Sequence, residues 1–120
     1  MRHVQSYGSV KIISLDREAL LVGLRACAQR LRAAHSEVSE VRIFGSIARG
    51  DQTGMSDADV LIVLDQPTAC DWLASIRRYV PYFDLPVGVD LIVLSRTEIA
   101  ARLAADDTFL RRAYQESLSI

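Results

Sequence analysis

The sequence contains little lysine and histidine, and both shortages narrow the chemistry available to it. Lys11 is the only lysine among 14 basic residues. Arginine therefore supplies nearly all the positive charge, and a guanidinium group is a good phosphate ligand but a poor proton acceptor. Any general base must be a carboxylate or one of the two histidines. His3 and His35 lie in polar segments, where we do not expect ligands.

Cysteine and long apolar runs are also scarce. Cys27 and Cys70 are too few for a disulfide framework and lack the spacing of a metal site, so we expect two buried, reduced thiols. No apolar run approaches the length that spans a membrane, and the first residues lack the apolar core of a signal peptide. These absences predict a cytoplasmic protein without membrane contact. The net charge of −1 gives no overall basic field for nucleic-acid binding.

The length of 120 residues fits one domain with one core. We expect an N-terminal arm over residues 1–15, with room for a short strand at 10–13, and one domain over 16–120. An apolar stripe at helical spacing predicts a helix over 16–34. Apolar runs predict strands at 41–44, 57–64 and 87–94, and the second of these is apolar enough to be buried on both faces.

Three further helices are predicted after the second and third strands. The first covers 68–79, the second follows the capping-box pattern at 95–98, and the third begins near Asp107. The residues expected to pack inward are Trp72, Leu73, Ile76 and Val80 in the first, and Phe109, Leu110, Ala113 and Tyr114 in the last. This alternation predicts a single α/β (α+β) domain, in which helices flank a small mixed sheet of three or more strands.

Three aspartates occur in or beside these apolar strands. Asp57 and Asp59 stand two apart at the start of the second strand, so their side chains project from the same face. Asp90 lies inside the third strand, where a lone ionised group would be costly. Carboxylates held close together repel one another and need a compensating cation. Three converging carboxylates form an oxygen-rich site suited to Mg²⁺ or Mn²⁺.

A glycine turn precedes the paired aspartates. Gly45 lets the chain leave its strand at a sharp angle and lets backbone N–H groups approach an anion. Ser46 adds a hydroxyl donor, so the two residues are a candidate phosphate site. Arg49 has several roles open to it: a phosphate contact, orientation of the acceptor, an ion pair with Asp51 or a contact at the helix end. Ser56 either bonds a phosphate or begins the strand, and we favour the phosphate.

These residues together carry a family resemblance. Gly45-Ser46, ten residues, then Asp57-Ala58-Asp59, with Asp90 on a later strand, resembles the motif of the DNA polymerase β-like nucleotidyltransferase superfamily. Within it, GSIARGD followed by SDADVLIVL is similar to the minimal nucleotidyltransferases (MNT) of HEPN/MNT toxin–antitoxin pairs. The resemblance covers about residues 16–118. It implies that Gly45 and Ser46 bind the triphosphate, that Asp57 and Asp59 ligate the metals, and that Asp90 ligates one metal and helps to activate the acceptor hydroxyl.

The same resemblance implies a metal-dependent enzyme that transfers a nucleoside monophosphate, AMP from ATP by analogy. Antibiotic-modifying relatives shape an acceptor pocket with an extra helical domain that has no counterpart in these 120 residues. We therefore expect a macromolecular acceptor, and by analogy an antitoxin that adenylylates a tyrosine of a HEPN-type ribonuclease toxin. Homo- and hetero-oligomers are both open.

Two alternatives stand beside this interpretation. One is a toxin that transfers nucleotides to tRNA ends. This activity requires a basic groove around two arginine pairs, Arg77-Arg78 and Arg111-Arg112. We favour a nucleic-acid acceptor less than a protein acceptor. The other is an antitoxin that blocks its partner by binding alone, without catalysis.

Overall fold

A four-stranded mixed sheet forms the centre of the computed structural model, which describes residues 2–7, 10–51 and 57–120. Its strands are β3 (Val38–Phe44), β4 (Ala58–Leu64), β5 (Val89–Ser95) and β6 (Leu118–Ser119), in the spatial order β5-β4-β3-β6. β4 pairs parallel with β5, whereas β3 pairs antiparallel with β4 and β6. The predicted α/β class and small mixed sheet are confirmed. The two-residue β6 was not predicted.

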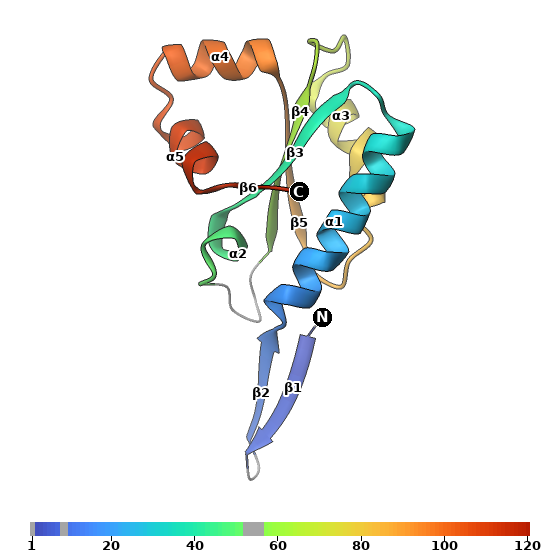
Figure 1. Cartoon of the computed structure of the whole chain (residues 1–120), viewed down its shortest axis with the longest axis vertical. Coiled ribbons are helices and arrows are strands. Elements are labelled where there is room, and N and C mark those ends of the chain that lie inside the picture. The colour runs from blue at the N-terminus through green and yellow to red at the C-terminus, as the bar shows by residue number, and fades with distance from the viewer. Residues whose placement is uncertain (1, 8–9, 52–56) are drawn as a thin grey trace.

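Helices cover both faces of this sheet. They are α1 (Arg17–Ala34), α2 (Gly45–Arg49), α3 (Trp72–Tyr79), α4 (Arg96–Ala104) and α5 (Thr108–Glu116), and a 3-10 turn, η1 (Val80–Tyr82), follows α3. α1 and α3 lie on one side of the strands and α4 and α5 on the other, while α2 lies at one end (Figure 1). Of the helices in the described ranges, none has the length and apolar content needed to cross a bilayer.

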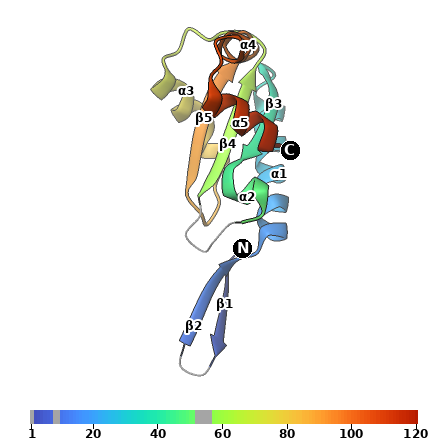
Figure 2. The same ribbon diagram turned by 90° about the vertical axis from the view of Figure 1, so that its left-hand side faces the viewer.

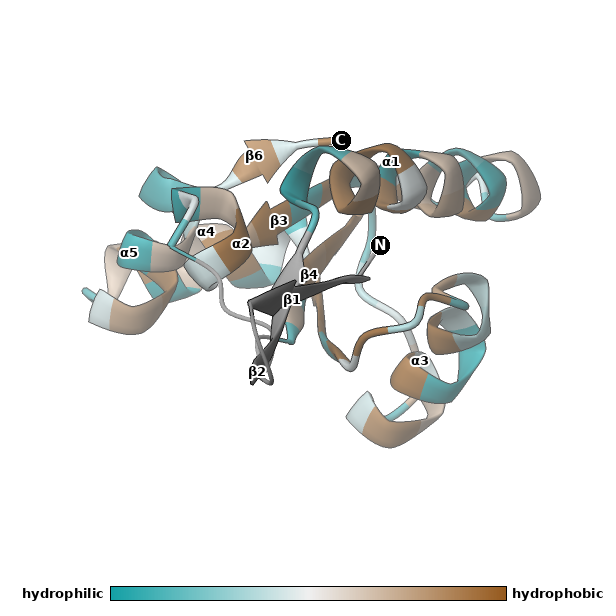
Figure 3. Cartoon of the chain, turned by 90° about the horizontal axis from the view of Figure 1, so that it is seen from below, coloured by the Kyte–Doolittle hydropathy of each residue, from teal (hydrophilic) through white to brown (hydrophobic). Residues whose placement is uncertain are grey.

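Strand β4 holds the two halves of the core together because its side chains alternate between them. Ala58, Val60, Ile62 and Leu64 belong to the cluster beneath α1 and α3. Leu61 and Val63 belong to the cluster beneath α4 and α5. Every β4 residue except Asp59 is buried, so the predicted burial on both faces is confirmed. In Figure 3, β3 and β4 run between α1 and α3 on one side and α4 and α5 on the other.

Side-chain caps define where four of the helices begin. The Asp71 carboxylate caps α3 and accepts a hydrogen bond of 2.7 Å from the Ala74 backbone N–H. The Asp16 carboxylate accepts a hydrogen bond of 3.1 Å from the Ala19 backbone N–H, and the Asp107 carboxylate accepts one of 3.0 Å from Leu110. Ser95 and Glu98 form the predicted capping box reciprocally, both bonds being 3.1 Å. Each cap satisfies backbone donors that have no partner within the helix.

The N-terminal segment forms a separate two-stranded hairpin. β1 (Arg2–Tyr7) pairs antiparallel with β2 (Val10–Leu15), in a register that runs from Arg2 opposite Leu15 to Tyr7 opposite Val10. The hairpin projects away from the four-stranded sheet (Figure 2). The strand expected at 10–13 is longer, and its partner over residues 2–7 was not predicted.

Several predicted positions of apolar side chains are wrong. Trp72 is 73% exposed, Leu73 41% and Phe109 61%, and Cys70 is exposed as well. Trp72, Leu73 and Phe109 all lie in the first turn of their helices. Helical spacing predicts which face of a helix is apolar, but it does not predict how far the neighbouring elements extend along that face. α3 is instead anchored by Tyr79 and Ser75, which are buried.

A matched pair of leucines tests this distribution of burial. Leu24 in α1 is fully buried, whereas Leu73 in α3 is 41% exposed. We expect Leu24→Ala to lower the free energy of unfolding by about 2–5 kcal/mol, because it leaves a cavity. Leu73→Ala should cost under about 1 kcal/mol. Urea denaturation of both variants measures the difference, and equal losses would contradict the position of α3.

Candidate active site

The three predicted aspartates lie at the same end of the sheet because of its strand pairing. Asp59 of β4 lies opposite Asp90 of β5 in the parallel register. Asp57 precedes β4 by one residue, and its spacing from Asp59 places both on the same face of the strand. On the other side of β4, Phe44 is opposite Asp59, so the turn at Gly45 begins beside that carboxylate.

Two glycines make room for these carboxylates. Gly45 has φ of +75°, and a Cβ atom there would lie 2.1 Å from Oδ2 of Asp59. A Cβ atom on Gly88 would lie 2.3 Å from Oδ1 of Asp57. Gly45 is therefore required both for its left-handed backbone and for its missing side chain. Gly88 was not identified from the sequence, although a glycine just before a strand that carries an aspartate can indicate a close approach to the backbone.

The environment of the aspartates differs across the site. Asp59 is half-buried, whereas Asp57 and Asp90 are exposed. Burial raises the pKa of Asp59 above its ordinary value, and the negative charges of Asp90 and Asp57 raise it further, while Arg49 opposes the shift. The expectation that Asp90 sits at a costly apolar position is wrong. β5 is an edge strand, and the Asp90 carboxylate reaches solvent.

The chemistry of this donor set suits a divalent cation. All three groups offer carboxylate oxygens, the ligands that Mg²⁺ prefers, and the charges that raise the Asp59 pKa are those a cation would neutralise. In the described part of the chain, no three acidic, histidine or cysteine side chains lie close enough together to form a metal site as they stand. Asp59 and Asp90 interact as a pair, and Asp57 lies beside Gly88.

A pocket of about 680 Å³ opens beside the aspartates. Its walls include five of the predicted site residues: Gly45, Ser46, Arg49, Asp59 and Asp90. α5 supplies residues that the sequence did not assign to the site: Phe109, Arg112, Ala113 and Glu116. Asp57 is not part of this lining, and Ser56 lies outside the described residues. Phe109 also meets the ring of Phe44 edge-on, with centroids 6.2 Å apart.

Arg49 makes the ion pair that the sequence left open and also lines the pocket. Its Nε–H donates to Asp51 over 3.2 Å, and Nη1 donates to Glu116 over 3.0 Å. The side chain is 38% exposed. Its positive charge partly offsets the rise in the pKa of Asp59 that burial and the neighbouring carboxylates cause. Ion pairing and a phosphate contact are therefore compatible, since one guanidinium carries five N–H donors.

α2, which carries Ser46 and Arg49, is held in place by α1. Arg17, at the start of α1, donates from Nε to the Ile47 carbonyl over 2.9 Å and from Nη2 to the Ala48 carbonyl over 3.2 Å. Carbonyl groups at the end of a short helix lack internal partners, and this arginine satisfies them. The sequence did not identify Arg17, because nothing in its local pattern indicates a contact with residues about thirty positions later in the chain.

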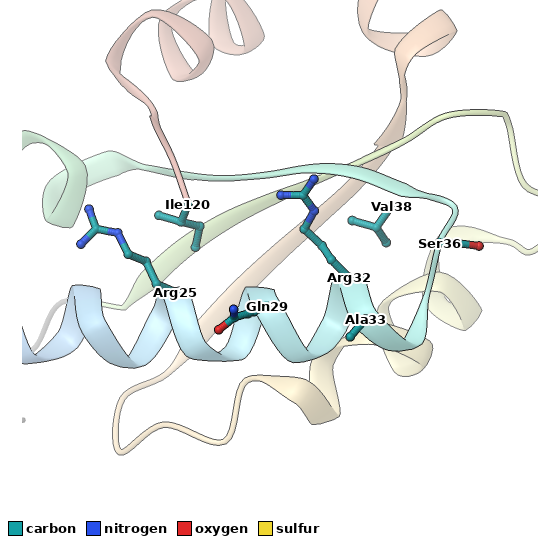
Figure 4. A pocket seen from close by; sticks show the side chains of 7 residues that line it. All are labelled: Arg25, Gln29, Arg32, Ala33, Ser36, Val38 and Ile120. Carbon is teal, nitrogen blue, oxygen red and sulfur yellow. The ribbon is translucent and has the colours of Figure 1, made fainter.

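A second cavity of about 710 Å³ lies between α1 and β3. Figure 4 shows its lining, which includes Arg25, Arg32 and Ile120. No aspartate, glutamate or glycine belongs to this lining. It therefore lacks both the cation ligands and the close backbone approach that mark the first pocket.

Aspartates on neighbouring strands beside a glycine-serine turn are an arrangement suited to phosphoryl-group chemistry. Comparison with known families agrees, because residues 24–114 match the profile of the nucleotidyltransferase domain. The chain therefore belongs to the nucleotidyltransferase domain family, which confirms the family predicted from the motif.

Among solved structures, a candidate nucleotidyltransferase from Sulfolobus solfataricus is similar to this chain. It shares 26% sequence identity at a TM-score of 0.60, and the match covers 71% of this chain and 75% of that one. A search of curated proteins finds no significant match.

The raised pKa of Asp59 predicts how its replacement affects stability. A carboxyl group whose pKa is higher in the folded than in the unfolded state destabilises the fold as the pH rises through the folded value. In the presence of a metal chelator, Asp59→Asn should therefore raise Tm at neutral pH. The gain should shrink as the pH falls through the ordinary range of aspartate titration.

Thermal melts at several pH values measure this effect. Asp65→Asn is the matched control, because Asp65 is exposed at the opposite end of β4. A lower Tm for Asp59→Asn at neutral pH would show that the ionised carboxylate stabilises the fold.

Proposed function

We propose that this nucleotidyltransferase transfers AMP from ATP to a protein acceptor, and that it acts as an antitoxin by adenylylating a HEPN-type ribonuclease toxin. The observation that carries the nucleotide-transfer part is one pocket that joins the Gly45-Ser46 turn to Asp59 and Asp90. The toxin partner and the choice of ATP rest on the similarity of GSIARGD and SDADVLIVL to the minimal nucleotidyltransferases.

In this proposal the turn and the aspartates have separate tasks. The Gly45 backbone and the Ser46 hydroxyl bind the phosphates, and Arg49 neutralises their charge. A divalent cation, Mg²⁺ or Mn²⁺, held by Asp57 and Asp59 with Asp90, would offset the developing negative charge and favour loss of the acceptor proton. The acceptor hydroxyl gives its proton to a carboxylate of the site, Asp90 by the family resemblance, and its oxygen attacks the α-phosphorus in line. A new P–O bond forms, the bond to the β-phosphate breaks, and pyrophosphate leaves.

The open side of the site supports a macromolecular acceptor. Asp57 and Asp90 are exposed, and Phe109 is exposed at the pocket wall. A small acceptor would need further walls to hold it near the α-phosphate, and a protein surface can supply them. An exposed tyrosine of a partner has the required hydroxyl group.

The arrangement of the arginine pairs does not favour the tRNA alternative. Arg77 and Arg78 lie on α3 and Arg111 and Arg112 on α5, and these helices pack on opposite faces of the sheet (Figure 1). Arg78 pairs with Glu37 over 3.7 Å, and Arg111 pairs with Asp106 over 2.5 Å. A single basic groove that uses both pairs is therefore not formed.

One labelling experiment separates the possible acceptors. The protein is incubated with Mg²⁺ and ATP labelled at the α-phosphate, together with a HEPN-type toxin in one tube and tRNA in another. Label on the toxin supports the proposal, and label on tRNA supports the transferase-toxin alternative. Toxin inhibition without any label indicates an antitoxin that acts by binding alone.

The paired aspartates give the sharpest test of transfer itself. Asp57→Ala/Asp59→Ala should abolish label transfer while the fold is retained, because the substitutions remove both ligands and an electrostatic repulsion. Circular dichroism and Tm monitor the fold, and Asp65→Ala is the exposed control. Full activity of the double variant would falsify the assignment.

Gly88 provides a second test, which leaves every aspartate in place. In Gly88→Ala the new methyl group must displace the Asp57 carboxylate, which is the flexible end of a side chain. We expect Tm to change little while the rate of label transfer falls at least about tenfold, since a misplacement of about 1 Å can cost that much. Unchanged transfer would mean that the position of Asp57 against Gly88 is irrelevant to the reaction.

A further inference from the structure

Two arginines from different helices line the nucleotide pocket, and one glutamate bridges them. Oε2 of Glu116 accepts from Nη1 of Arg49 over 3.0 Å, and its Oε1 accepts from Nε of Arg112 over 3.1 Å. All three side chains belong to the pocket wall that also contains Asp59 and Asp90. We propose that Arg112 is a second phosphate-binding residue, which grips the polyphosphate chain of the nucleotide together with Arg49. This inference rests on the proposed function.

The bridge leaves donors available on both guanidinium groups. Glu116 accepts the Nε–H of Arg112, and the two terminal nitrogens of Arg112 carry four further N–H bonds. Arg49 gives Nε–H to Asp51 and one Nη1–H to Glu116, so three of its five N–H donors have no partner among the described residues. Charge-assisted hydrogen bonds from planar guanidinium groups suit phosphate oxygens, because two donors point in one direction.

The stability of the fold does not explain this arrangement. The Arg112 side chain is 75% exposed, and an ion pair in such a position contributes little to folding. The pair does orient the arginine, since Arg112 and Glu116 stand one helical turn apart on α5. Glu116 in turn links α5 to α2. It therefore fixes the separation of the two guanidinium groups at the pocket.

Arg111 is the natural control, because it has the same chemistry one position away. It pairs with Asp106 over 2.5 Å, its side chain is 50% exposed, and it does not belong to the pocket lining. One residue in a helix turns the side chain by about 100°, which is enough to place Arg112 at the pocket and Arg111 outside it.

The experiment measures binding instead of turnover. Dissociation constants are determined by calorimetry for ATP, AMP and inorganic tripolyphosphate with the full chain, in the presence of Mg²⁺. Arg112→Gln should weaken ATP and tripolyphosphate binding about tenfold, the expected effect of losing a charge-assisted hydrogen bond. AMP binding should hardly change, because AMP lacks the β- and γ-phosphates. Arg111→Gln should bind all three ligands like the unmodified protein.

A double variant separates a direct contact from an effect transmitted through Arg49. If Arg112 touches phosphate itself, Arg112→Gln weakens tripolyphosphate binding further in a chain that already carries Arg49→Gln. If Arg112 only positions Arg49, the second substitution has no additional effect, and the inference is overturned. Equal affinities for Arg112→Gln and Arg111→Gln overturn it as well.

The proposed function can fail separately. If tripolyphosphate binding depends on Arg112 but the protein transfers no label, the phosphate site is supported and the transferase function is rejected. If the unmodified protein transfers label and Arg112→Gln binds ATP normally, the transferase function is supported and the role of Arg112 in phosphate binding is rejected. A protein that binds neither ATP nor tripolyphosphate rejects both.

Discussion

The candidate active site depends on the close approach of one carboxylate to one backbone turn. Asp59 stands where a side chain on residue 45 would have to be, so only glycine allows β3 to end and α2 to begin beside it. The left-handed conformation of Gly45 has the same requirement. Because the turn carries Ser46 and leads to Arg49, this single contact brings the phosphate-binding candidates to the carboxylates.

A network of contacts between β3 and the C-terminal end of α5 holds this helix against the sheet. The Arg42 guanidinium of β3 lies 4.6 Å from the centre of the Tyr114 ring, donates to Ser117 over 2.6 Å and pairs with Glu40. The Tyr114 hydroxyl also donates to Glu40, over 3.1 Å. These contacts anchor the C-terminal half of α5 to β3. Arg112 and Glu116 of the same helix are thereby placed over the pocket.

Much of the chemistry was readable in the sequence because it is encoded locally. The interval from Gly45-Ser46 to Asp57 and Asp59 predicted the turn, the shared face of the carboxylates and the family. The side of the pocket formed by α5 was not readable. In the sequence, Arg112 is one member of an arginine pair that was considered only for a basic groove, and its difference from Arg111 arises only when the helix packs on the sheet. Gly88 and Arg17 escaped notice for the same reason, since their partners lie about thirty residues away.

The sequence by itself determined most of the elements, β1 and β6 excepted, and the identity of the reactive groups, because hydrophobic periodicity, caps and short motifs act over a few residues. Only the tertiary structure decided which of these groups meet. The order β5-β4-β3-β6 placed Asp90 on an exposed edge strand and in register with Asp59. The packing of α5 turned Glu116 toward Arg49. Such contacts depend on how strands pair and helices pack, and neighbours along the chain do not specify that.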